Sequence, residues 1–211
     1  SIAVMQGITE ICEQNALPPS DIAHIFHGTT VATNAALESK GVKTGMITTR
    51  GFRDVLHIGR HQRPQHYSIR QGIPWQERPR VRRENRKVGT ERQTPPKGEV
   101  QTPLDETDVR RVALELKEAQ VTAICICFLY AYINPEHELR AKAIVQEVCP
   151  EIFVTTSHEV SPLFREFERF TTTAMNAYIG PLVRDYVSNL ETVITARGFT
   201  AGLRIMRSNG G

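Results

Sequence analysis

The feature that most constrains the fold of this chain is an uninterrupted apolar run, AICICFLY, at residues 123–130. A strand that is exposed on one face alternates apolar and polar residues, so a run without alternation predicts a strand buried on both faces. Such a strand lies inside a parallel sheet that has helices on each side. Helical patterns precede and follow it, starting at residues 103–105 and at Pro135. We therefore predict an α/β fold with a substantially parallel sheet.

Apolar periodicity and capping residues predict the remaining elements. Helices are expected over residues 2–15, from residue 105, over 138–148, over 164–180 and from Pro181 to Gly198. Further strands are expected over residues 22–27, 43–48, 152–156 and 203–206. Proline favours the first turn of a helix, so Pro181 is expected to begin a new helix. The strands at 22–27 and 43–48 are expected to form a βαβ-like unit with the helix between them.

A turn between the first of these strands and its helix has the composition of an anion site. Thr29 or Thr30 is expected to cap the helix, and Gly41 is expected to end it as a left-handed C-cap. The free N–H groups at such a helix start and the helix dipole both favour an anion, although a plain capped helix has the same pattern. The chain contains no G-x-x-x-x-G-K-[ST] and no G-x-G-x-x-G, which argues against a phosphate-loop NTPase and a dinucleotide fold.

The net charge of +3 is unevenly distributed, because residues 60–97 contain eleven Lys or Arg and three Glu, a local charge of +8. This segment also holds five of the twelve prolines and the single tryptophan, Trp75, so we expect an extended arm or a long loop. It lacks the aromatic stacking pattern of a nucleic-acid module, which disfavours nucleic-acid binding and favours a solvated or partner-covering arm.

Cysteine spacing and hydropathy indicate the compartment. The four cysteines, at residues 12, 125, 127 and 149, have no disulfide-scaffold spacing, so reduced thiols are expected. The longest apolar run is too short to span a bilayer, and the N-terminus lacks the order of a signal peptide. We expect a cytoplasmic protein without membrane association.

Three groups of polar residues have the composition of possible sites. Asp54, His57 and His61 share a helix face if that segment is helical, which gives either a metal set or a hydrogen-bonded trio. Residues 157–159 read Ser-His-Glu, but neighbours on an extended chain point apart and do not form a catalytic triad. The charged residues around Glu166 form either a surface charge lattice or a functional cluster. The pattern alone leaves both alternatives open.

Several blocks in order along the chain resemble the hydantoinase A and 5-oxoprolinase family. They are HGTTVATNAALESKG, TTRGFRDVLHIGR, CFLYAYINPEHE, SHEVSPLFREFERFTTTAMNAYIGP and the final SNGG. The resemblance implies the N-terminal domain of that family over residues 1–211, with a basic arm at 60–100 and a second domain that begins near residue 208. A DxGGTFTD-like phosphate loop is absent, so we expect a fragment of a larger protein that does not hydrolyse ATP alone.

The resemblance implies a ribonuclease H-like, actin-like ATPase domain with a mixed, mostly parallel sheet and flanking helices. It implies ATP and Mg²⁺ as cofactors and the opening of a cyclic amide such as hydantoin, N-methylhydantoin or 5-oxoproline, through phosphorylation of the amide oxygen. An ATP-dependent ketone carboxylase subunit is the alternative, since carboxylases phosphorylate an enolate oxygen. A B-type hydantoinase subunit and a homo-oligomer are the implied partners, and a non-catalytic module that docks on such a subunit is a further alternative.

The resemblance also assigns residues. The expected nucleotide-binding or cleft-wall residues are His27, Gly28, Thr29, Thr30, Thr33 and Asn34. The expected substrate-binding residues are Arg60, Arg63, Arg165 and Arg169, where Arg60 and Arg63 neutralise a phosphate or a carboxylate. Glu166 is the expected catalytic residue, in a polar or base role.

Overall fold

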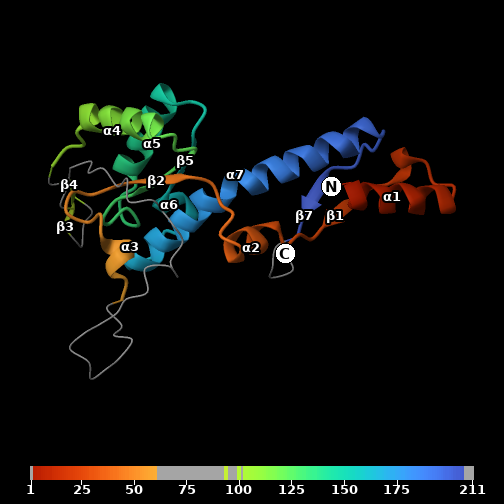
Figure 1. Ribbon diagram of the computed structural model, residues 1–211, viewed down its shortest axis with the longest axis horizontal. Coiled ribbons are helices and arrows are strands. Elements are labelled where there is room, and N and C mark those ends of the chain that lie inside the picture. The colour runs from red at the N-terminus through yellow and green to blue at the C-terminus, as the bar shows by residue number, and fades with distance from the viewer. Residues whose placement is uncertain (1, 61–92, 95–98, 101, 207–211) are drawn as a thin grey trace, which may run out of the picture. The chain divides into compact units, whose positions relative to one another are not determined.

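A parallel sheet of three strands, in the order β2-β5-β6, organises the larger part of the structure (Figure 1). Its strands are β2 (Thr44–Thr48), β5 (Ala123–Cys127) and β6 (Phe153–Thr156). The computed structural model describes residues 2–60, 93–94, 99–100 and 102–206. Within it the chain forms two compact units: the sheet unit, Ser39–Pro181, and the terminal unit, Ser1–Glu38 with Leu182–Gly211.

The central strand β5 is buried on both faces, as its apolar run predicts. Ile124 and Ile126 pack against α4 (Glu106–Glu118) and α5 (Glu136–Val148), while Cys125 and Cys127 pack against the first half of α7 (Glu166–Ala196). Figure 1 shows α4 and α5 on the opposite side of the sheet from the start of α7. Helices therefore cover both faces, and all four cysteines are free thiols.

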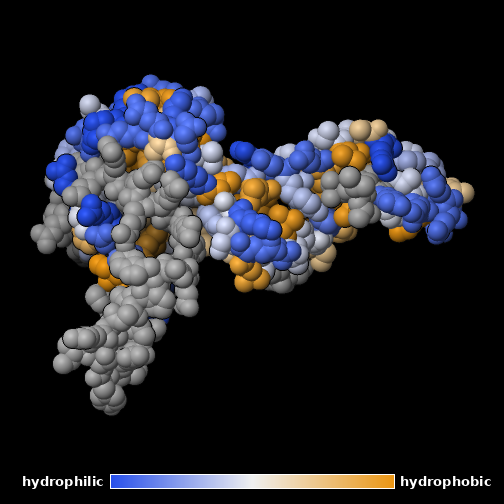
Figure 2. All heavy atoms as spheres, viewed as in Figure 1, coloured by the Kyte–Doolittle hydropathy of each residue, from blue (hydrophilic) through white to orange (hydrophobic). Residues whose placement is uncertain are grey.

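A helix cap and a surface ion pair stabilise α4 and α5, the outer helices of the sheet unit. The Asp105 carboxylate accepts a hydrogen bond from the Asp108 N–H at 3.0 Å and caps α4. Arg110 of α4 forms a bidentate ion pair with Glu147 of α5, at 2.8 and 3.0 Å. The outward surface of these two helices is mostly hydrophilic (Figure 2). Neither they nor any other helix in the described ranges combines the length and apolar character of a membrane span.

The prediction of two C-terminal helices is wrong, because α7 continues through Pro181 for 31 residues. A proline inside a helix costs roughly 3 kcal/mol through the lost hydrogen bond and a clash with the preceding turn. Burial on both sides of the proline, at Ala177 and Leu190 among others, offsets that cost. Gly198 has a φ of 83° and follows the helix end as predicted.

Two local predictions also need correction. Residues 157–160 are not extended but form the one-turn helix α6 (Ser157–Val160), because the Thr156 Oγ1 accepts from the Glu159 N–H at 3.3 Å. The helix after the first strand, α2 (Val31–Leu37), ends before Gly41, and Ser39 is the residue with a left-handed φ of 54°. Gly41 instead lies in close contact with the Tyr178 ring, which leaves no room for a Cβ at this position.

In the terminal unit, β1 (Ile25–His27) pairs in parallel with β7 (Leu203–Ile205). The expected βαβ unit of the first two strands is therefore wrong, because β2 pairs with β5 instead. The short strand β1 packs Ile25 into a core formed with α1 (Ile2–Gln14) and the second half of α7. The remaining elements are η1 (Pro19–Asp21), α3 (Val55–Ile58), β3 (Gln93–Thr94) and β4 (Glu99–Val100).

Some expectations fall outside the described residues. They are most of the basic arm with Trp75, the residues His61 and Arg63, and the turn at 208–211. Among the residues that the structure describes, no group of three or more His, Cys, Asp or Glu side chains could hold a metal ion.

Candidate functional site

The start of α7 brings together most of the charged residues that the sequence assigns to substrate binding. Arg165 precedes this helix and Glu166 begins it, and the Arg169 Nη2 lies 3.5 Å from a Glu166 carboxylate oxygen. Arg60, which follows α3, forms an ion pair with Glu168 in the first turn of the helix. The pKa of Glu168 is lowered by a hydrogen bond with its own backbone and, to a smaller extent, by Arg60. Four of the predicted residues thus occupy one place in the fold.

Arg169 is fully buried within this cluster, with an exposed side-chain fraction of 0%. Its guanidinium donates to the Phe128 carbonyl at 3.0 Å, the Leu163 carbonyl at 3.0 Å and the Ser157 Oγ at 3.1 Å. The same group lies 5.2 Å from the centroid of the Tyr132 ring. Arg169 therefore ties α7 to the segments that follow β5 and β6, and its donors are occupied by protein groups.

Glu138 of α5 is the second buried charge of the cluster, and the sequence analysis did not select it. One carboxylate oxygen accepts from the Phe128 N–H at 2.8 Å and the Ser157 hydroxyl at 2.7 Å, and the other accepts from the His158 N–H at 2.8 Å. Burial raises the pKa of Glu138, and these hydrogen bonds and the charge of Arg169 partly offset the rise. A sequence signal exists, because Glu138 lies on the buried face of α5 with Ala141.

This Glu138–Ser157–Arg169 network lies at the carboxyl ends of the parallel strands. Phe128 follows β5 and Ser157 follows β6, while the Thr49 hydroxyl after β2 accepts from the Leu129 N–H at 3.1 Å. Ligands of parallel α/β sheets bind outside the carboxyl ends of the strands. The buried network therefore holds together the segments at the strand ends where a ligand would bind.

The residues that the network presents to solvent are those of the segment before α7. Phe164 is 67% exposed and packs edge-on against Tyr132, with ring centroids 5.8 Å apart. Arg165 is exposed and has a φ of 85°, an uncommon conformation for a residue with a side chain. An exposed arginine, a part-exposed carboxylate at Glu166 and an apolar ring are thus available to a ligand at this edge of the sheet unit.

The predicted nucleotide turn belongs to the terminal unit. His27 ends β1, and its Nε2 lies 2.8 Å from the Tyr186 hydroxyl of α7. Thr29 Oγ1 accepts from the Val31 N–H at 3.3 Å, whereas Thr30 is the N-cap residue of α2 and makes no side-chain capping hydrogen bond. Thr30 instead accepts from the Asn34 amide at 3.4 Å. Thr33 and Asn34 are exposed on α2, so the turn carries several polar groups that face solvent.

Neither packing nor backbone conformation requires a glycine at position 28 of this turn. Its φ lies outside the left-handed region, and a Cβ added to it would meet nothing within 4 Å. The space beside the Gly28 backbone, where a side chain would lie, is therefore open. A glycine in such a place permits close approach of a ligand to the chain.

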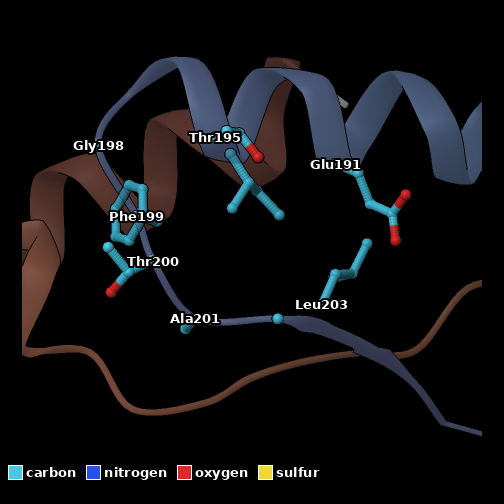
Figure 3. A pocket seen from close by; sticks show the side chains of 9 residues that line it. Glu191, Thr195, Gly198, Phe199, Thr200, Ala201 and Leu203 are labelled. Atoms are coloured by element: carbon cyan, nitrogen blue, oxygen red, sulfur yellow. The ribbon is translucent and has the colours of Figure 1, made fainter.

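A separate hollow of about 580 Å³ lies in the terminal unit between the end of α7 and β7 (Figure 3). Glu191 and Thr195 line it from the helix, and Phe199 and Leu203 line it from the segment that follows. None of the residues assigned from the sequence lines this hollow. Its one charged lining group is the Glu191 carboxylate, which does not suit a phosphate.

The sequence matches one family of proteins along most of its length. Residues 1–149 match the model of the hydantoinase/oxoprolinase N-terminal region, and residues 169–211 match the hydantoinase/oxoprolinase model. The caprolactamase subunit alpha of Pseudomonas jessenii is 32% identical, over 100% of this chain and 31% of the relative. The 5-oxoprolinase of Saccharomyces cerevisiae is 29% identical, over 99% of this chain and 18% of the relative.

Two solved structures extend the likeness to the fold. The crystal structure of the ATP-dependent caprolactamase from Pseudomonas jessenii matches 100% of this chain and 31% of that chain, with a TM-score of 0.86. An acetone carboxylase in its nucleotide-free state matches 88% of this chain and 27% of that chain, with 28% identity and a TM-score of 0.73. The chain thus spans less than a third of each of these relatives, and the expected actin-like ATPase fold with parallel sheets is confirmed. By sequence and by structure, the chain belongs to the hydantoinase/oxoprolinase family.

Proposed function

We propose that this chain is part of an ATP-dependent enzyme that opens a cyclic amide. The observation that carries the proposal is the match of the whole chain to the ATP-dependent caprolactamase, at 32% identity and a TM-score of 0.86. The 5-oxoprolinase among the relatives is named for the same kind of reaction on a different ring. We further propose a cytoplasmic location and assembly with a B-type subunit and with further copies, since the caprolactamase chain is named as a subunit.

The chemistry explains why ATP is needed. A ring amide is a poor electrophile because donation from the nitrogen lone pair reduces the positive charge on its carbonyl carbon. ATP, when bound, supplies a phosphoryl group to the amide oxygen and so makes that carbon open to attack by water. The protein then has to hold the phosphates, orient the ring and remove a proton from water.

The terminal unit supplies groups that fit a polyphosphate. His27, the Thr29 and Thr30 hydroxyls and the backbone at Gly28 offer donors, and the open space beside Gly28 admits an acceptor oxygen. In our proposal Thr33 and Asn34 extend this surface along α2. Mg²⁺ belongs to the proposal as the usual partner of ATP phosphates, although the described residues hold no three-ligand cluster for it.

The sheet unit supplies groups that fit the ring and the water. Arg165 is exposed and is our choice for an anionic group of the substrate, whereas Arg60 is already paired with Glu168. Glu166 is part-exposed and would accept the proton of the attacking water. Arg169 supports this arrangement through its three hydrogen bonds, and direct substrate binding by Arg169 stays an untested prediction.

The test uses the full-length protein together with its partner subunit. ATP hydrolysis and ring-opened product are measured with caprolactam, 5-oxoproline and hydantoin in turn. We expect phosphate release that depends on one of these rings, and a kcat that falls by about 10²–10⁴-fold in Glu166→Gln, the usual contribution of a general base. ATP turnover that is independent of every cyclic amide would contradict the proposal.

The match to acetone carboxylase favours a second candidate, ATP-dependent ketone carboxylation. Its signature is consumption of acetone or acetophenone that requires both ATP and bicarbonate. If that activity appears and no ring-opened product forms, the carboxylase assignment replaces the amidase.

A further inference from the structure

We propose that Tyr186 is a positioning residue for His27, and that it fixes the imidazole as an Nδ1–H donor to a phosphate oxygen. The inference rests on the proposed nucleotide role of the turn at residues 27–30. It concerns a residue that neither the family resemblance nor the predicted site includes. Its basis is the hydrogen bond between His27 and Tyr186, the second ring nitrogen of His27, and the open space at Gly28.

The contact joins two elements far apart in sequence. His27 lies at the end of β1 and Tyr186 lies in the second half of α7, and their Nε2 and Oη atoms are 2.8 Å apart. Their rings are tilted by 32° with centroids 5.8 Å apart. Both side chains are half-buried. A hydrogen bond of this length between side chains on packed elements restricts the rotation of the imidazole.

In our proposal the Tyr186 hydroxyl donates this hydrogen bond, and the direction of donation sets the His27 tautomer. The Tyr186 hydroxyl carries one proton, and within the described residues its hydrogen-bond partner is the His27 Nε2. If the hydroxyl donates, Nε2 accepts, and the neutral imidazole must then carry its proton on Nδ1. Metal-ligating histidines are oriented in the same way, by a partner on the nitrogen that does not contact the ligand.

The opposite nitrogen is the one left for a ligand. Nδ1 of His27 has no hydrogen-bond partner among the residues that the structure describes. The next residue, Gly28, leaves open space where a side chain would be. A fixed N–H donor at the carboxyl end of a parallel strand suits an atom that only accepts hydrogen bonds. Phosphate oxygens of a nucleoside triphosphate have this property.

The first test reads the tautomer without reference to activity. In the ¹⁵N-histidine-labelled protein at neutral pH, the resonance lost in His27→Gln should show the Nδ1–H tautomer. Tyr186→Phe, which keeps the ring, should shift it towards the Nε2–H tautomer that free histidine favours. Tyr178→Phe is the matched control, because Tyr178 lies in the same helix and its hydroxyl has no hydrogen bond within the described residues. A tautomer that is unchanged in Tyr186→Phe overturns the inference.

The second test measures the dissociation constant for ATP of the full-length protein by calorimetry. Loss of a hydrogen bond to a charged group predicts about tenfold weaker binding in His27→Gln. Tyr186→Phe should weaken binding about threefold, since the donor remains but loses its orientation. Tyr178→Phe should not change it. Equal affinity in Tyr186→Phe despite a changed tautomer overturns the positioning role. No ATP binding by the wild-type protein refutes the proposed function, whereas the tautomer result still decides the pairing of the two residues.

Discussion

Replacement of Arg169 by alanine should destabilise the sheet unit strongly. The guanidinium makes three hydrogen bonds of 3.0–3.1 Å from a fully buried position. Each hydrogen bond to a charged group contributes about 1.5–3 kcal/mol. The total is smaller than their sum, because burial of the guanidinium itself costs several kcal/mol. We therefore expect a loss of about 3–5 kcal/mol, the range found when one partner of a buried charge network is removed.

Urea denaturation followed by circular dichroism measures this loss as a lower midpoint at an unchanged m value. Arg184→Ala is the control, because Arg184 lies on the exposed side of the same helix and pairs with Asp185 at the surface. That change should stay within about 0.5 kcal/mol. The reasoning is refuted if Arg169→Ala costs less than about 1 kcal/mol, since the buried network would then contribute no more than an ordinary surface residue.

Three further predictions concern stability. Gly41→Ala should lower the free energy of unfolding by about 1–3 kcal/mol through the clash with Tyr178, whereas Gly202→Ala meets nothing within 4 Å and should be near neutral in the same urea assay. Asp105→Ala should cost about 0.5–2 kcal/mol in thermal unfolding, because α4 loses its cap. Burial raises the pKa of Glu138 in the folded state, so its contribution to stability is present at low pH and is lost as the pH rises through the raised value. Glu138→Gln should flatten that decline in urea midpoints measured against pH, and an unaltered slope would contradict the assignment.

Sequence reasoning predicted the elements whose residues carry a strong local pattern. The strand β5 and the helix α4 were predicted within a few residues, because an apolar run reflects burial directly and acidic residues favour the first turn of a helix. The continuity of α7 through Pro181 was not predictable, since packing on both sides of the proline outweighs a local preference. The pairing of β1 with β7 was missed because strand partners are chosen by contacts distant in sequence.

In the candidate sites too, local sequence patterns were predictable and contacts between distant elements were not. The blocks around His27 and Glu166 supplied most of the predicted site residues, and the roles of these residues stay predictions. Arg169 looked like a surface or substrate residue, and its burial follows only from the way α7 packs on the sheet. Glu138 and Tyr186 were missed because their partners, Ser157 and His27, lie on other elements.

The most direct test of the account is ATP binding by the full-length protein with valine at position 28. In the structure a Cβ on Gly28 meets no neighbour within 4 Å, so Gly28→Val should leave the melting temperature unchanged. If the turn holds the phosphates of ATP, the added side chain occupies their space. We predict at least about tenfold weaker binding of ATP, a loss of about 1.4 kcal/mol. An unchanged dissociation constant in a stably folded Gly28→Val protein would contradict the assignment of this turn to the nucleotide.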